Sequence, residues 1–122
     1  MPIPDQDMEK YRETARKRRE AAELQRLQRL DQAWKVARQA SQILCDEFQA
    51  REVAVFGSLV HPELFHLRSD IDLAVWGLEE RLYLQAVARV TSLDPDISVD
   101  LIAVEESSPS LREHIQDKAV PI

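Results

Sequence analysis

The first fifty residues have the hydrophobic spacing of an amphipathic helix. Residues 5–50 contain neither proline nor glycine, so no helix-breaking residue interrupts them. Apolar side chains recur three or four positions apart, which places them on one helical face. The pattern predicts one long helix, or two joined helices, packed along this face. The face consists of Leu27, Leu30, Trp34, Ala37, Ser41, Leu44 and Phe48.

Beyond residue 50 the helical spacing gives way to short apolar runs and to strict alternation. The first run is rich in β-branched residues and ends at Gly57, and the second alternates with aspartates. Both patterns predict buried strands. The expected elements are strands over 53–56 and 71–75, a helix over 79–93, a strand over 97–104, and a short helix over 111–117 before a tail, 119–122.

This order of elements predicts an α/β or α+β fold, with a small mixed sheet flanked by helices and a long N-terminal helix. The 122 residues provide for one hydrophobic core and not for two. We therefore divide the chain into an N-terminal helical extension, residues 1–50, and a compact domain, residues 51–122.

Charge is distributed unevenly between these two parts. Residues 1–50 carry ten Lys and Arg against nine Asp and Glu, whereas residues 51–122 carry six against thirteen, a net charge of −7. Such an acidic domain argues against direct binding of nucleic acid, which needs clustered cations. It permits a site where carboxylates converge on a divalent metal.

Cys45 is the only cysteine, and no apolar stretch is long enough for a membrane helix. The first residues are too polar and acidic for a secretory signal. These features predict a cytoplasmic protein without membrane association.

The charged segment 11–23 within the helical extension has two interpretations. It is either a solvated helical face or an arm that docks on a partner protein. A nucleic-acid arm is disfavoured because glutamates, among them Glu13 and Glu20, dilute its cations.

Three aspartates lie in or beside the expected strands, where carboxylates are uncommon. Asp70 and Asp72 are two residues apart, so a strand places both side chains on one face. If the second and third strands are neighbours, Asp100 comes to lie beside this pair. Three carboxylates so close together need a compensating cation, and Mg²⁺ prefers such oxygen ligands.

Each of these features alone has an ordinary structural explanation. Gly57-Ser58 can be a turn with Ser58 as a helix cap, and Asp100 can protect a strand edge from aggregation. Their combination is more specific, because eleven residues separate Ser58 from Asp70 and 27 separate Asp72 from Asp100.

In three segments the chain resembles the nucleotidyltransferase superfamily of the DNA polymerase β type, and most of all its smallest branch, the minimal nucleotidyltransferases (MNT). The resemblance covers roughly residues 51–122 and implies the nucleotidyltransferase fold. The segments are Val55-Phe56-Gly57-Ser58, Ser69-Asp70-Ile71-Asp72-Leu73-Ala74-Val75, and Val99-Asp100-Leu101-Ile102.

The resemblance implies a site for ATP and two Mg²⁺ ions. Gly57 and Ser58 would hold the triphosphate, and Ser69 belongs to the same nucleotide-binding set. Asp70 and Asp72 would bind both metal ions, which clamp the attacking and leaving oxygens at the α-phosphorus. Asp100 would complete the metal nearer the acceptor hydroxyl and lower the pKa of that hydroxyl, directly or as a general base.

The loop after Ser58 departs from the family pattern. Family members often continue with a basic or small residue and a second glycine, whereas residues 59–68 contain no glycine. His61, His66 or Arg68 could supply the missing cation near the γ-phosphate, or each could be a surface or packing residue.

The length of the chain leaves no room for a second, substrate-selecting domain. Small MNT proteins are commonly paired with a HEPN-domain ribonuclease toxin. The resemblance therefore implies an antitoxin in a hetero-oligomer that transfers AMP from ATP to a tyrosine of the HEPN toxin. Two other functions stay open: a non-catalytic antitoxin that acts by binding alone, and a nucleotidyltransferase for a small molecule such as an aminoglycoside.

Overall fold

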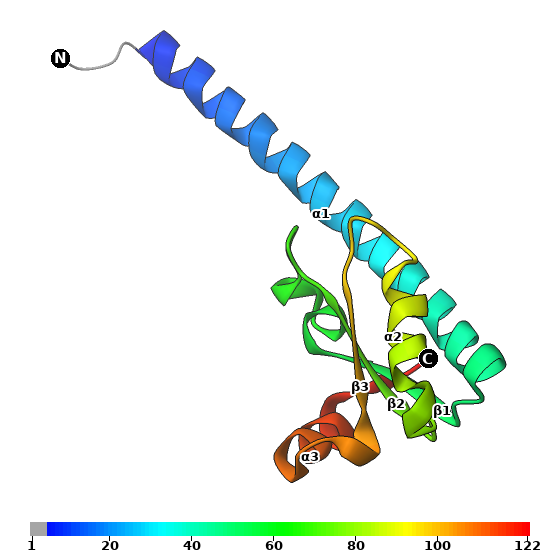
Figure 1. Cartoon of the computed structure of the whole chain (residues 1–122). Coiled ribbons are helices and arrows are strands. Elements are labelled where there is room, and N and C mark those ends of the chain that lie inside the picture. The colour runs from blue at the N-terminus through cyan, green and yellow to red at the C-terminus, as the bar shows by residue number, and fades with distance from the viewer. Residues whose placement is uncertain (1–4) are drawn as a thin grey trace.

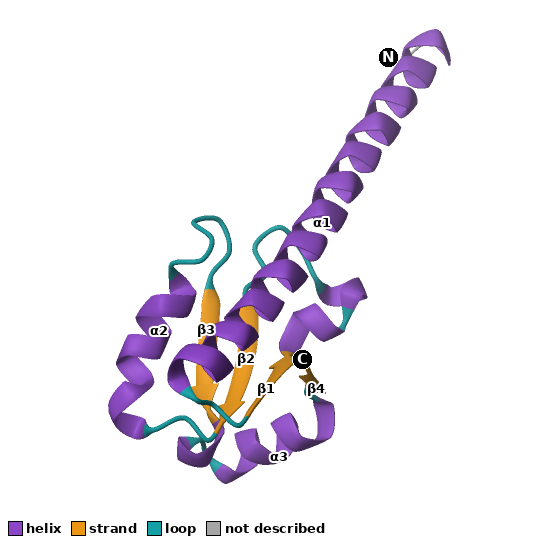
Figure 2. Cartoon of the chain, turned by 90° about the vertical axis from the view of Figure 1, so that its right-hand side faces the viewer, coloured by secondary structure: helices purple, strands orange, loops and turns teal. Residues whose placement is uncertain are grey.

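The structure, a computed structural model, describes residues 5–122. Its longest element is helix α1, Asp5–Phe48, which forms because no proline or glycine interrupts this stretch (Figure 1). The first four residues of the predicted extension, 1–50, lie outside the described part. The second half of α1 packs on the domain, and the first half projects away from it (Figures 1 and 2).

The packed face of α1 begins later than the sequence predicted. Leu27 is 47% exposed, whereas Leu30 and Trp34 contact the core. The prediction was wrong at Leu27 because the core reaches only to the next turn of the helix. The buried residues of α1 are Ala33, Val36, Ala37, Ala40, Ser41, Ile43 and Leu44.

A four-stranded mixed sheet forms the centre of the domain, in the order β3-β2-β1-β4. β2 pairs antiparallel with β1 and parallel with β3, which confirms the predicted mixed sheet. The tail adds a short strand that the prediction lacked, because two residues, one of them proline, leave no alternation to detect. The strands are β1, Glu52–Phe56, β2, Ile71–Trp76, β3, Val99–Ala103, and β4, Val120–Pro121.

Two short helices complete the fold. α2, Tyr83–Thr91, follows a 3₁₀ turn and provides the crossover that parallel strands β2 and β3 require. α3, Pro109–Lys118, begins after Ser108, whose hydroxyl accepts a hydrogen bond from the Leu111 backbone N–H. Within residues 5–122 no helix combines the length and the apolar character needed to cross a membrane.

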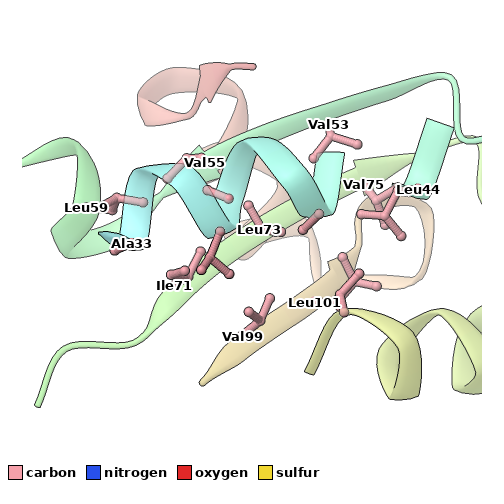
Figure 3. Close-up of a cluster of buried hydrophobic side chains, with 14 of the residues drawn as sticks. Ala33, Leu44, Val53, Val55, Leu59, Ile71, Leu73, Val75, Val99 and Leu101 are labelled. Carbon is pink, nitrogen blue, oxygen red and sulfur yellow. The ribbon is translucent and has the colours of Figure 1, made fainter. Parts of the chain in front are cut away.

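The two faces of the sheet have different covers. The strand side chains labelled in Figure 3 lie on the α1 side of the sheet and form the main core. On the opposite face, Phe56 and Ala74 form a smaller cluster with Ile115 of α3. Because side chains alternate along a strand, Asp72 lies on this second face, one step before the covered Ala74. At this end of the face Asp70 and Asp100 are exposed and Asp72 is partly buried.

Candidate active site

The three aspartates of the sequence prediction lie on adjacent strands. The parallel register of β2 and β3 places Asp72 directly opposite Asp100, so the two strands are neighbours, which was the condition for Asp100 to lie beside the pair. Asp70 immediately precedes β2 and, two residues from Asp72, lies on the same face. Asp72 is partly buried, whereas Asp70 and Asp100 are exposed. One carboxylate thus forms the floor of the site, with two others open to solvent.

The carboxylates repel one another. Burial raises the pKa of the Asp72 carboxyl above its ordinary value, and the negative charges of Asp100 and Asp70 raise it further. Among residues 5–122 no three His, Cys, Asp or Glu side chains form a ready-made metal centre. The donor set is nevertheless one that Mg²⁺ prefers, because a cation would relieve this repulsion through oxygen ligands.

Gly57 lies directly against Asp72. It directly follows β1 and has a φ of +76°, a left-handed conformation that favours glycine. Its neighbour Phe56, the last residue of β1, pairs with Asp72 across the sheet. A β-carbon at Gly57 would collide with Oδ2 of Asp72. The turn backbone therefore lies close to the Asp72 carboxylate, with no Gly57 side chain between them.

Ser58 follows in a 3₁₀ turn, Gly57–Val60, and is partly buried. This turn has no side-chain cap, so the capping explanation for Ser58 does not apply. Its position beside Gly57 is compatible with the predicted contact to a triphosphate.

Ser69 occupies a different environment from Ser58. It is only 6% exposed, and its Oγ accepts a hydrogen bond of 2.9 Å from the His66 backbone N–H. The Ser69 backbone N–H donates in return to the His66 carbonyl. This mutual pair closes the loop just before Asp70. Nucleotide contact by Ser69 stays a prediction, and its observed partners give it a role in shaping the loop.

The three candidate cations of the loop have local partners or are exposed. Nδ1 of His61 lies 3.6 Å from Oε1 of Glu63, and Nδ1 of His66 accepts a hydrogen bond from the Arg68 backbone N–H. The Arg68 side chain is exposed. None of these contacts assigns the role of a missing phosphate-binding cation to one residue.

Sequence reasoning missed two arginines that hold the site loops. Arg26 and Arg29 of α1 donate hydrogen bonds to backbone carbonyls of the loops before β2 and β3. They were missed because arginines on an amphipathic helix are usually solvent-facing. Their only sequence signal is a spacing of three residues, which puts both on one helical side.

A cavity of about 690 Å³ lies at the end of β3. Ile102, two residues after Asp100 and on the same side of the strand, lines it together with Leu84, which is 79% exposed. Tyr83 contacts β3 here, and its hydroxyl donates a hydrogen bond of 2.6 Å to the Leu101 carbonyl. The lining also carries three acidic residues, Glu80, Glu105 and Glu106.

Residues 38–122 match the family described as polymerase beta, nucleotidyltransferase, and the chain belongs to that family. One similar solved structure is described as a minimal nucleotidyltransferase, with 32% identity, a TM-score of 0.59, and coverage of 76% of this chain and 95% of the other. A second is a toxin–antitoxin crystal structure with AMP-PNP, with 22% identity, a TM-score of 0.56, and coverage of 68% and 69%, respectively. No curated protein matches the chain. These findings agree with the fold and the superfamily that the sequence motifs predicted.

Replacing Asp72 by asparagine is expected to stabilise the metal-free protein. Because the folded state raises the pKa of Asp72, the ionised carboxylate disfavours folding at pH 7, and stability rises as pH falls through the folded pKa. The neutral amide removes that penalty, so Tm at pH 7 should increase by about 2–5 °C. Calorimetry without divalent ions tests this, with exposed Asp117→Asn as the control. A lower Tm for Asp72→Asn at pH 7 would contradict it.

Proposed function

We propose that this protein is the antitoxin of a HEPN/MNT-type module in the cytoplasm, and that it transfers AMP from ATP to a tyrosine of the HEPN toxin. The observation that carries the chemistry is the register that sets Asp72 opposite Asp100, with Gly57 against Asp72. Family membership supports nucleotidyl transfer. The fold shared with a toxin–antitoxin structure containing AMP-PNP supports the class of partner and donor.

In this proposal the open face of the sheet holds the donor and the acceptor. Asp70, Asp72 and Asp100 would hold two Mg²⁺ ions, which supply charge stabilisation at the attacking and leaving oxygens. The Gly57-Ser58 turn binds the triphosphate through backbone N–H groups and the Ser58 hydroxyl. Gly57 fits this task because it has no side chain and lets the turn backbone lie against the Asp72 carboxylate.

Asp100 is the residue best placed to receive the acceptor proton. It is exposed, whereas Asp72 beside it is partly buried. As a general base, Asp100 accepts the proton of the tyrosine hydroxyl, whose oxygen then forms a bond to the α-phosphorus of ATP. The bond from the α-phosphorus to the oxygen bridging to the β-phosphorus breaks, and pyrophosphate leaves.

Two alternative functions have specific support. The glycine-free loop after Ser58 favours an antitoxin that acts by binding alone. The cavity at the end of β3 favours a cationic small molecule as acceptor, because Glu80, Glu105 and Glu106 line it and Ile102, two residues after Asp100, lines it too.

The decisive experiment combines the protein with a HEPN protein encoded beside it, ATP and Mg²⁺, and measures the intact mass of the partner. We expect a gain of one or more AMP groups on the partner. The matched control is Asp100→Asn, which should lower the transfer rate by about 10²–10⁴-fold without dissociating the complex.

Two results would contradict the proposal. An unmodified but inhibited partner in a stable complex would support the binding-only antitoxin. Transfer of AMP to an aminoglycoside, with none to the partner protein, would support the small-molecule enzyme.

A further inference from the structure

Arg29 of α1 joins the two loops from which the aspartates emerge. Its Nη2 donates to the Ser69 carbonyl at 3.1 Å, and its Nη1 donates to the Asp96 carbonyl at 3.0 Å. Ser69 directly precedes Asp70, and Asp96 lies four residues before Asp100. One guanidinium thus spans the entries to β2 and β3.

The environment of Arg29 indicates a fixed position. The residue is partly buried, and its Nε is buried without a hydrogen-bond partner among the described residues. An unsatisfied buried donor is costly, and the hydrogen bonds of the two terminal amino groups hold the side chain in place against that cost. The fork of a planar guanidinium fixes the relative position of two acceptors, which a lysine ammonium does not do. A backbone hydrogen bond of 2.9 Å from Ile71 N–H to the Ser98 carbonyl continues the connection into the sheet.

Arg26 makes the corresponding contact with the loop that follows the Gly57-Ser58 turn. Its Nη1 donates to the Pro62 carbonyl at 2.7 Å and to the Phe65 carbonyl at 3.3 Å. Glu23 holds the same guanidinium through two hydrogen bonds of 2.9 and 2.7 Å. Three residues apart on α1, the two arginines therefore hold different halves of the site.

We propose that Arg29 is a positioning residue that sets the distance of Asp100 from Asp70 and Asp72, and that Arg26 positions the loop behind the phosphate-binding turn. The helix α1 is then part of the site, and not only an extension that packs beside it. The assignment of metal and nucleotide rests on the proposed function, whereas the division of labour between the arginines rests on their own contacts.

The test compares Arg29→Gln and Arg26→Gln in the full chain, with exposed Arg38→Gln on the same helix as the matched control. Calorimetry measures the Kd for Mn²⁺ alone and the Kd for AMP-PNP at saturating Mg²⁺. Mutation of a residue that supports metal ligands from the outer shell typically lowers metal affinity 10–100-fold. We expect Arg29→Gln to weaken Mn²⁺ binding about 10-fold. For Arg26→Gln we expect weaker AMP-PNP binding with Mn²⁺ binding within about twofold of wild type, and Arg38→Gln should change neither.

Arg29→Lys is the control that separates a loss of positioning from a general loss of folding. Because lysine keeps the charge but loses the fork, it should retain the fold, measured by Tm, and still weaken Mn²⁺ binding. Wild-type Mn²⁺ affinity in both Arg29 variants would overturn the positioning role, even if their Tm falls. Equal losses of Mn²⁺ affinity in Arg26→Gln and Arg29→Gln would also overturn the positioning role of Arg29. If the Arg29 variants bind Mn²⁺ more weakly but the HEPN partner stays unmodified, the proposed function alone is overturned. If the wild-type protein binds neither Mn²⁺ nor AMP-PNP, both the proposed function and the positioning roles are overturned.

Discussion

Replacement of Asp70 and Asp72 together by asparagine should lower nucleotidyl transfer by at least about 10³-fold. Asparagine keeps the size of each side chain but removes both charges that would hold the metal ions, so the developing charge at the α-phosphorus loses its stabilisation. The measurement is single-turnover transfer of labelled AMP at saturating ATP and Mg²⁺.

The fold of the double variant should survive. The folded state disfavours ionisation of the Asp72 carboxyl, and Asp70 is exposed. Its Tm without metal should therefore equal or exceed that of the wild type, and added Mg²⁺ should no longer raise it, because ligand stabilisation requires binding to the native state. Transfer above about one tenth of the wild-type rate would remove these carboxylates from the mechanism.

Gly57→Ala should reduce both stability and nucleotide binding. Alanine at a φ of +76° costs roughly 1–2 kcal/mol, and its β-carbon collides with the Asp72 carboxylate. We expect the free energy of unfolding to fall by about 2–4 kcal/mol in urea titrations, with AMP-PNP binding at Mg²⁺ saturation weakened more than about 10-fold.

Gly77→Ala is the matched control for that substitution. Gly77 has nearly the same φ, +75°, but its β-carbon would meet Arg51 and not an aspartate. It should cost comparable stability and leave the affinity of the folded protein for AMP-PNP unchanged. Equal loss of affinity in both alanine variants would mean that Gly57 has no special relation to the site.

The elements that carry the site could be predicted from the sequence because their signals are local. Alternation of Ile71, Leu73 and Val75 with two aspartates identifies a strand and also fixes the shared face of Asp70 and Asp72. The three motif segments then indicate the fold, which the family match confirms.

The remaining features depend on contacts between distant parts of the chain. The pairing of Asp72 with Asp100 follows from a parallel register across α2, which no local pattern encodes. β4 forms only because β1 offers a free edge to two residues near the C-terminus. The hydrogen bonds that Arg26 and Arg29 make to the site loops end on backbone carbonyls, and these acceptors have no signature in the identity of the residues that carry them.

The first half of α1 projects from the domain (Figure 1), so the direction in which its outer residues face depends on the number of residues between them and the domain. α1 has 44 residues and is about 66 Å long, and its arginines fix its rotation relative to the site loops. One residue inserted before Glu23 would turn the outer segment by about 100° while moving it by only about 1.5 Å. Seven inserted residues, close to two full turns, would restore its orientation about 10 Å farther out. A partner that contacts both the outer helix and the domain would thus tolerate added length only in whole turns.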